Sequence, residues 1–161
     1  MDQIDYKILS VLEENARIPI AEMSRMIAMS QPAVTERIRK MEEQEVITGY
    51  RADLSPSKLG KHTSAFVLFK STDCKAFEAF SEASPEIIDL YRISGEFNYL
   101  MKVVTENGES MARFLDACHA FGFSTTLIVL STPFEDKSLV AAKVESDVRA
   151  QIQPEPKVKR M

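Results

Sequence analysis

The chain has 161 residues, of which 45% are hydrophobic and 27% are charged, and its net charge is −4. This composition is typical of a soluble globular protein with room for one domain or two small ones. The negative net charge excludes a general nucleic-acid binder, which would be basic. No apolar run approaches the roughly 20 residues that cross a bilayer. The N-terminus is acidic where a signal peptide would be basic, so we expect a cytoplasmic protein.

The first 45 residues are predicted to form three helices. Asp2 can cap a helix that runs to about Ala16 and carries an apolar stripe that includes Ile4 and Ile8. Residues 19–43 then read as two short helices joined by a tight turn. Their buried faces are assigned to apolar residues three or four positions apart, namely Met23, Met26 and Ile27, then Val34, Ile38 and Met41.

Ser30 and Pro32 mark the start of the third helix, because serine is a good N-cap and proline suits a first helical turn. Its outer face is polar and basic: Gln31, Pro32, Thr35, Glu36, Arg39 and Lys40. Amphipathic helix pairs are common and often only pack a core. Here the short turn and the small or amide side chains at the start of the third helix favour a DNA-binding helix-turn-helix, whose second helix enters the major groove by that end.

Nine residues are the candidate DNA contacts: Arg25, Ser30, Gln31, Pro32, Thr35, Glu36, Arg37, Arg39 and Lys40. Their local basic excess on an acidic protein fits a sequence-specific binder that needs dimerisation for affinity. Gln31, Thr35 and Arg39 are predicted to touch base edges, and Glu36 can accept a hydrogen bond from a cytosine amino group. The phosphate contacts are assigned to Arg25, Arg37 and Lys40. Arg37 lies at the margin of the buried face, so pairing with a neighbouring carboxylate is its alternative role.

Residues 46–54 are β-prone and end at Ser55-Pro56, which predicts a strand or hinge between two domains. Six elements are then predicted: strand 65–69, helix 75–83, strands 87–94 and 97–105, a helix marked by Met111, Phe114, Leu115 and Cys118, and a last buried strand, 126–131. Their order, β-α-β-β-α-β, is the ferredoxin-like plan, with helices on one face of the sheet. Because the strands are apolar on both faces, the open face is expected to pack against a second copy.

Four segments stand in an order and spacing that together are specific: IDYKILSVLEENARI, MSQPAVTERIRKMEEQEVITGY, YRISGEFNYLMKV and STTLIVLS. They resemble the Lrp/AsnC family, the leucine-responsive or feast/famine transcription regulators. The resemblance implies an α+β protein with an N-terminal trihelical winged or helix-turn-helix domain and a C-terminal ferredoxin-like domain that dimerises through its sheet. It also implies a pseudo-palindromic operator in double-stranded DNA, assembly to a homodimer, tetramer or octamer, and no membrane partner.

An amino acid or related small metabolite is the effector that the resemblance implies. The candidate effector residues are Gly95, Glu96, Phe97, Asn98, Ser124 and Thr126. Backbone N–H groups beside Gly95 could hold a carboxylate and Glu96 an ammonium group, whereas the alternative is an ordinary hairpin turn. Three residues depart from the family pattern: Glu45, where glycine usually ends the third helix, Asn98, where aspartate is usual, and Glu36, where many relatives are basic. Glu45 must accept a left-handed backbone or end the helix differently.

The resemblance and the patterns together divide the chain into four parts. These are residues 1–45, the helix-turn-helix domain; 46–62, a β hinge or linker; 63–135, the ferredoxin-like effector-binding and oligomerisation domain; and 136–161, a C-terminal extension. In the extension, Val140, Val144, Val148 and Ile152 recur at four-residue steps, which predicts an extra helix. The final QPEPKVKRM is proline-broken and basic, so disorder is expected there.

The alternative function is a small ferredoxin-like dimeric enzyme, or a metabolite-binding subunit, with a helical appendage. The catalytic candidates are poor: Cys118 and His119 are neighbours on a helix and point apart, and His62 stands alone. Cys74 and Cys118 suit neither a disulfide framework nor a metal cluster, and Cys118 is expected to be a reduced packing residue. We therefore predict no catalytic site, no metal and no cofactor.

Overall fold

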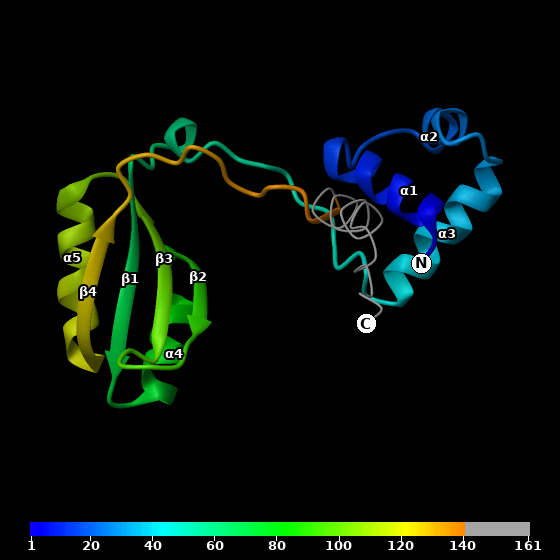
Figure 1. Ribbon diagram of the computed structural model, residues 1–161. Helices are drawn as coiled ribbons and strands as arrows, with labels where there is room; N and C mark the ends of the chain where they lie inside the picture. The colour runs from blue at the N-terminus through cyan, green and yellow to red at the C-terminus, as the bar shows by residue number, and fades with distance from the viewer. Residues whose placement is uncertain (141–161) are drawn as a thin grey trace, which may run out of the picture. The chain divides into compact units, whose positions relative to one another are not determined.

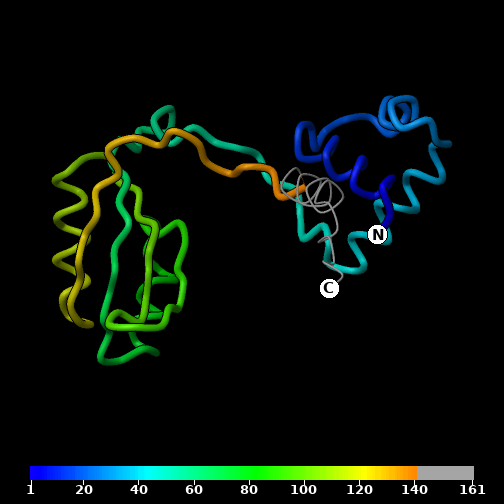
Figure 2. The backbone as a smooth tube through the Cα atoms, viewed as in Figure 1, coloured from blue at the N-terminus to red at the C-terminus, as the bar shows by residue number. Residues whose placement is uncertain are grey.

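The computed structural model describes residues 1–140, which form two compact units (Figure 1). The first unit comprises residues 1–52 and the segment that begins at Phe134, and the second runs from Asp53 to Pro133. Figure 2 traces the chain through both units. No helix among the described residues is long and apolar enough to cross a membrane. The predicted helix through Val144 and Val148 and the basic end of the chain lie outside the described residues.

Three helices build the first unit, as the sequence predicts: α1 (Gln3–Glu14), α2 (Ile20–Met26) and α3 (Gln31–Glu43). Their shared core consists of Ile8, Met23, Val34, Ile38 and Met41. Asp2 caps α1 as expected, since its side chain accepts hydrogen bonds from two N–H groups of the first turn. No strand occurs among residues 1–52, so this unit is a three-helix module without a wing.

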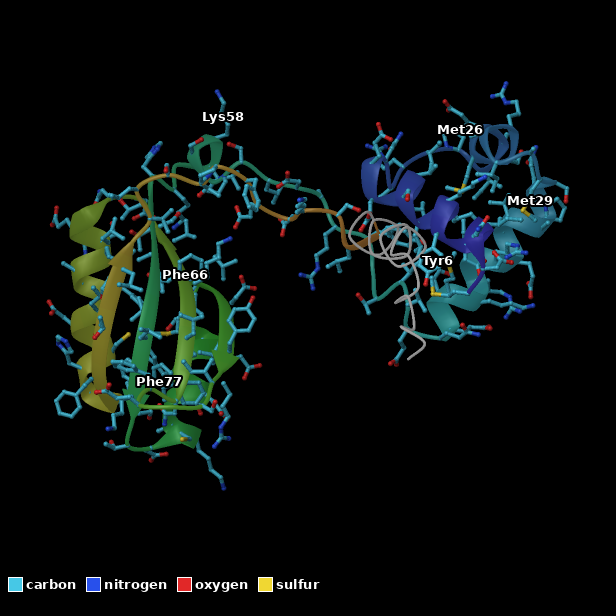
Figure 3. The ribbon with its side chains drawn as sticks, in the orientation of Figure 1. Tyr6, Met26, Met29, Lys58, Phe66 and Phe77 are labelled. Atoms are coloured by element: carbon cyan, nitrogen blue, oxygen red, sulfur yellow. The ribbon has the colours of Figure 1, made fainter. Side chains whose placement is uncertain are left out.

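Two predicted details of these helices are wrong. Helix α1 ends at Glu14 and not at about Ala16, because Asn15 leaves the helical region and its N–H closes the last turn. Met26 is 60% exposed and does not belong to the buried face of α2 (Figure 3). That face is centred on Met23 and Ser24, and Met26 lies on the flank away from Ser24 because successive residues advance by about 100° around a helix.

Helix α3 ends at a left-handed residue that is not glycine. Glu45 has φ 56°, and the N–H groups of Glu45 and Val46 donate to Glu42 and Met41 at 3.0 and 2.8 Å. This pair of hydrogen bonds is the Schellman ending, which favours glycine at the left-handed position. Of the two outcomes that the sequence leaves open for Glu45, the structure therefore adopts the strained one, at a cost of roughly 1 kcal/mol.

Of the two alternatives that the sequence leaves open for residues 46–54, a strand or a hinge, the structure does not adopt the strand. These residues contain no strand or helix, and a short 3-10 helix, η1 (Pro56–Leu59), follows them. A β-prone sequence becomes a strand only where another strand offers hydrogen bonds, and no described strand pairs with this segment. The boundary between the two compact units, after Ala52, falls within this segment.

The second unit has the predicted ferredoxin-like order. Its elements are β1 (Thr63–Ser71), α4 (Cys74–Ala83), β2 (Ile87–Arg92), β3 (Tyr99–Thr105), α5 (Gly108–Cys118), η2 (His119–Phe121) and β4 (Gly122–Ile128). The strands form one antiparallel sheet in the order β2-β3-β1-β4, in which the apolar strand β1 is central.

Both helices of this unit pack on one face of the sheet. Phe69 of β1 stacks on Phe77 of α4 with ring centroids 4.1 Å apart, and Phe114 and Cys118 of α5 join the same core. Figure 3 labels Phe77 of α4 and Phe66 of β1. The side chain of Phe66 alternates with that of Phe69 and so lies on the other face of the sheet. The register places six apolar side chains on that open face: Phe66, Leu68, Tyr91, Leu100, Phe123 and Leu127.

The last strand differs from its prediction. β4 begins at Gly122, four residues before Thr126, and ends at Ile128, while Leu130 beyond it is 94% exposed. It is an edge strand and not a buried one, because only β1 pairs with it. Gly122 is required at its start, since a Cβ there would lie 2.1 Å from the carbonyl oxygen of Lys70.

We expect Glu45→Gly to raise the free energy of unfolding of the first unit by about 0.5–1 kcal/mol, because glycine accepts a positive φ without the steric cost borne by Glu45. Thermal unfolding followed by circular dichroism measures this. The matched control, Glu43→Gly, places glycine inside α3 and should lower stability by a similar amount. Equal effects of the two substitutions would contradict the role of Glu45.

Candidate functional site

Helices α2 and α3 are joined by the four residues 27–30 in a turn of fixed conformation. Ala28 has φ 55°, and the N–H of Met29 donates to the carbonyl of Ser24 at 3.0 Å. This is the same Schellman ending that closes α3. Ser30 is the N-cap of α3, as predicted, but its side chain makes no capping hydrogen bond. The hydroxyl of Ser30 and the N–H groups of the first turn of α3 are therefore not paired with each other.

The outer face of α3 is exposed as the sequence predicts. Val34, Ile38 and Met41 are buried, and the exposed residues are Gln31, Pro32, Thr35, Glu36, Arg39 and Lys40. Pro32 lies in the first turn, where its missing N–H costs nothing. The structure thus brings six of the nine candidate DNA contacts onto one continuous surface. Arg25 lies on the neighbouring α2 and is exposed, with its Nε donating to the carbonyl of Ala21 at 3.2 Å.

Glu36 is the centre of the charge pairing on this surface. It accepts two hydrogen bonds from Arg39, at 2.8 and 3.0 Å, and lies 3.8 Å from the ammonium of Lys40. Arg39 also pairs with Glu43. The hydrogen bond from Arg39 lowers the pKa of Glu36, so this carboxylate is ionised at neutral pH. A base or phosphate that engages Arg39 must displace Glu36, and these exposed pairs are weak enough in water to exchange.

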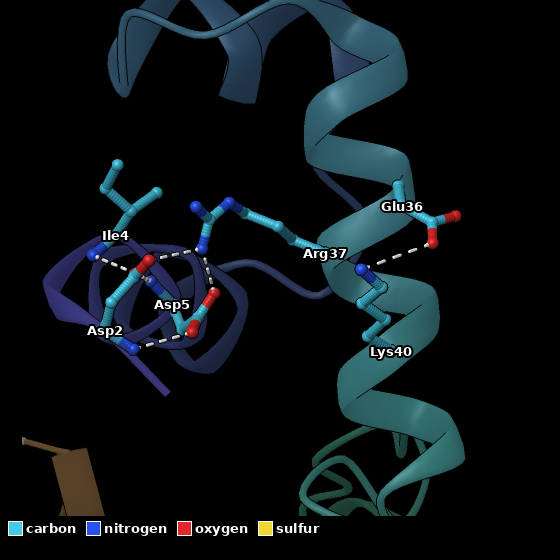
Figure 4. A network of polar contacts seen from close by, with 6 residues as sticks. All are labelled: Asp2, Ile4, Asp5, Glu36, Arg37 and Lys40. Atoms are coloured by element: carbon cyan, nitrogen blue, oxygen red, sulfur yellow. Dashed lines mark hydrogen bonds and ion pairs between the residues drawn. The ribbon is translucent and has the colours of Figure 1, made fainter.

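Arg37 has partners in α1 (Figure 4). Its guanidinium donates to Asp2 at 2.8 Å and to Asp5 at 2.6 Å, and its side chain is only 28% exposed. Asp2 and Asp5 also form the capping box of α1, each accepting the other's backbone N–H. Arg37 therefore joins α3 to the start of α1, which is the alternative role that its position in the sequence indicates.

The candidate effector loop contains one residue with a clear structural task. The side-chain oxygen of Asn98 accepts the N–H of Ser71 at 2.8 Å, and its amide nitrogen donates to the carbonyl of Ser71 at 3.1 Å. The side chain thus pairs with the end of β1 as another strand would. An aspartate could accept the first hydrogen bond but could not donate the second. Sequence reasoning missed this contact, because nothing local links residues 27 positions apart.

The remaining effector candidates lie around the same end of the sheet. Gly95 and Glu96 are exposed and Phe97 is half-buried. The N–H of Asn98 donates to Phe69 of β1 at 3.1 Å, and Ser124 of β4 pairs with Phe69 from the other side. The loop and Ser124 therefore lie on opposite sides of Phe69 in β1. Their backbones are two strand spacings apart, and each spacing is about 4.8 Å. Thr126 lies two residues further along β4, on the same face as Ser124.

Known protein families match both units. Residues 1–42 match the AsnC-type helix-turn-helix domain, and residues 64–139 match the Lrp/AsnC ligand-binding domain. The chain is 41% identical over 132 residues to the HTH-type transcriptional regulator YezC of Bacillus subtilis, an alignment that covers 82% of this chain and 95% of YezC. It is 37% identical over 147 residues to the proline dehydrogenase transcriptional activator of Rhodobacter capsulatus, with 86% and 96% of the chains covered.

A solved structure has the same fold. Bacillus subtilis LrpC superposes with a TM-score of 0.81 at 29% sequence identity, over 85% of this chain and 99% of LrpC.

We expect Arg37→Ala to lower the melting temperature of the first unit by a few degrees at neutral pH, since it removes both ion pairs to α1. The N–H of Asp5, and after it Arg37, lowers the pKa of Asp2 from its ordinary 3.8. The stability that the Asp2 carboxylate contributes is therefore complete above about pH 4 and is lost as pH falls through the lowered pKa. In Arg37→Ala the loss of stability at acid pH should be smaller but not absent, because the N–H of Asp5 still lowers the pKa of Asp2.

Melting curves between pH 2 and pH 7 measure both effects, and Arg113→Ala serves as the control. Arg113 forms an ion pair with Glu109 of its own helix, α5, at 2.8 Å, on the exposed surface of the other unit. If the two variants melt alike at neutral pH, Arg37 does not fix α3 to α1.

Proposed function

We propose, from the premise that this chain belongs to the Lrp/AsnC family of transcription regulators, that it binds a pseudo-palindromic operator as a homodimer and responds to an amino acid or related metabolite. The chain is a DNA-binding regulator with a small-molecule-binding domain. The observation that carries the proposal is the outer face of α3. It is polar and basic along the helix, and the burial of Val34, Ile38 and Met41 turns it outward.

The start of α3 supports a division of roles among the DNA contacts. Gln31, Thr35 and Arg39 lie on one exposed face at helical spacing, so they reach successive base edges when the helix lies in the major groove. The hydroxyl of Ser30 and the first-turn N–H groups beside Pro32 suit a phosphate oxygen, because a helix N-terminus attracts anions.

Phosphate contacts are assigned to Arg25 and Lys40. Glu36 is placed to accept a cytosine amino group once Arg39 has turned to the DNA. Arg37 acts indirectly, because its two carboxylate partners hold it against α1. The role proposed for Arg37 is therefore to position α3 and not to contact a phosphate.

Dimerisation is proposed through the open face of the sheet. Phe123 is 74% exposed and Leu127 51% exposed, and both share this face with Phe66 and Tyr91. Exposed apolar side chains gathered on one face of a sheet in this way are normally covered by another protein surface. Two copies related by a two-fold axis would present two α3 helices to half-sites about 34 Å apart, which is why the operator is expected to be pseudo-palindromic. Tetramers or octamers would add further copies to this dimer.

The effector is proposed to bind at the loop of residues 95–98. Exposed N–H groups beside Gly95 can hold a carboxylate, and Glu96 can pair with an ammonium group. Ser124 and Thr126 can add hydroxyl contacts from β4, whereas Asn98 contributes by holding the loop against Ser71. Phe97, which is half-buried in the same loop, offers an apolar surface. A relative named as the activator of proline dehydrogenase supports amino acids or their derivatives as the class of effector.

We infer that the protein acts by binding and not by catalysis, in the cytoplasm with the chromosome that it regulates. Burial raises the pKa of the Cys118 thiol to about 12, so it stays protonated and is a poor nucleophile. His119 and Asp116 form only an exposed contact at 3.8 Å. Among the described residues, no cluster of histidine, cysteine or carboxylate side chains could hold a metal ion. No observation favours the enzyme alternative.

The first test is DNA binding. Fragments selected from a random pool provide the operator, and fluorescence anisotropy measures affinity at several salt concentrations. Arg39→Ala should weaken operator binding about tenfold or more and relax the preference at one base pair in each half-site. Lys40→Ala should weaken binding to all sequences and reduce the salt slope by about 1 for each subunit. Arg113→Ala is the matched control. Unchanged affinity and salt slope in both α3 variants would refute the assignment.

The second test is assembly. Leu127→Asp places a charge on the open face of the sheet and should shift the full-length protein from dimer to monomer in sedimentation velocity experiments, with loss of tight operator binding. Leu59→Asp is the control, because Leu59 is 63% exposed but lies in η1, away from the sheet. A wild-type protein that binds its operator tightly as a monomer would exclude this arrangement.

The third test is effector binding. Calorimetry with each of the twenty amino acids at millimolar concentration should identify at least one that binds. Glu96→Gln should weaken it by removing the partner of the ammonium group, and Gly95→Arg should block the site. Glu82→Gln, a change of the same kind on the exposed side of α4, should bind as the wild type does. If no amino acid binds, or if Gly95→Arg binds equally well, the loop is an ordinary hairpin turn.

A further inference from the structure

A wide hollow lies between the start of α2 and the first turns of α3. Its volume is about 700 Å³, and it is lined by Ile20 of α2 and by Gln31, Pro32, Thr35 and Glu36 of α3. Of the described residues that line this hollow, Glu36 alone carries a charge. Because every DNA phosphate is negative, a carboxylate at this place opposes binding unless a hydrogen-bond donor faces it.

In the free protein, the donors that face Glu36 come from α3 itself. Arg39 donates two hydrogen bonds to this carboxylate, and the ammonium of Lys40 lies 3.8 Å from it. Figure 4 shows Glu36 beside Lys40, whereas Arg37 extends toward α1. The side chains of Arg39 and Lys40 are 54% and 61% exposed, so both can turn toward DNA. Glu36 and DNA therefore compete for the same two cations.

The outcome of this competition depends on the base that faces Glu36. When Arg39 and Lys40 turn to DNA, the carboxylate loses its donors but stays close to the phosphates. The exocyclic amino group of cytosine or adenine in the major groove replaces those donors, whereas guanine and thymine present a carbonyl oxygen that repels a carboxylate. The unfavourable effect of Glu36 is thus removed only where an amino group lies opposite it.

We propose that Glu36 determines specificity by weakening the binding to every DNA sequence that lacks an amino group opposite it. The inference rests on the proposed DNA binding by α3, and its new content is that Glu36 rejects other sequences more than it strengthens operator binding. It also couples two readouts, because Arg39 leaves Glu36 without cost only when the base facing Glu36 is correct. Such rejection matters because a chromosome offers a large excess of competing sites.

Glu36→Ala tests this inference in the full-length protein. Alanine is a good helix former and the Glu36 side chain is 47% exposed, so the variant should fold. Fluorescence anisotropy measures its affinity for the selected operator and for an unrelated duplex of the same length. We expect affinity for the unrelated duplex to rise about threefold or more, and the ratio of operator to unrelated affinity to fall about tenfold. At one base pair of each half-site, the variant should bind all four bases alike.

The matched control is Glu43→Ala, which removes the other carboxylate partner of Arg39, seven residues further along α3. It should raise both affinities by the same factor and leave their ratio as in the wild type. If Glu36→Ala leaves the ratio unchanged, or if both variants lower it equally, Glu36 contributes only its charge and the inference fails while DNA binding by α3 stands. A wild-type protein that selects no sequence from the random pool would instead overturn the proposed function, and this inference with it.

Discussion

The orientation of α3 depends on the burial of Val34, Ile38 and Met41 against Ile8 and Met23. These contacts set which way the helix is rotated about its axis, and so which of its side chains are exposed. Hydrophobic contacts are not directional, whereas the ion pairs of Arg37 with α1 are, so the two together define one rotation. A small three-helix unit has little apolar area to bury, so even small contributions from its helix ends and ion pairs matter to its stability.

Helical periodicity in the sequence was sufficient to identify α3, because proline, the buried face and the exposed face all agree there. It was insufficient for Met26, since a seven-residue helix has too few turns to define its buried face. Strand propensity failed at residues 46–54, where β-prone residues have no strand to pair with in the described chain. The first and last residues of β4 are set by its pairing with β1 and not by the run of apolar residues in the sequence. The polar residue Ser124 therefore lies inside the strand.

In the candidate sites too, contacts within one helix can be predicted from the sequence, whereas contacts between distant segments cannot. The pairing of Glu36 with Arg39 follows from their spacing on one helix, and the sequence makes both visible. The pairing of Asn98 with Ser71 depends on how β3 and β1 come together, and no local pattern contains it. The family resemblance marks Asn98 as a departure from the usual aspartate, and the hydrogen bonds show what this side chain does here: an amide can satisfy both an N–H and a carbonyl of the neighbouring backbone.

The separation of the first unit into two stretches of sequence has a consequence for synthesis on the ribosome. The helices α1 to α3 emerge first, but Ser138 and Leu139, which donate hydrogen bonds to Glu13 of α1, follow only after the whole second unit, Asp53–Pro133. At about 5–20 residues per second, these 81 residues take roughly 4–16 s to translate. The nascent chain therefore exposes the three helices without these hydrogen bonds while the ligand-binding unit folds, and the part of the protein made first is the part completed last.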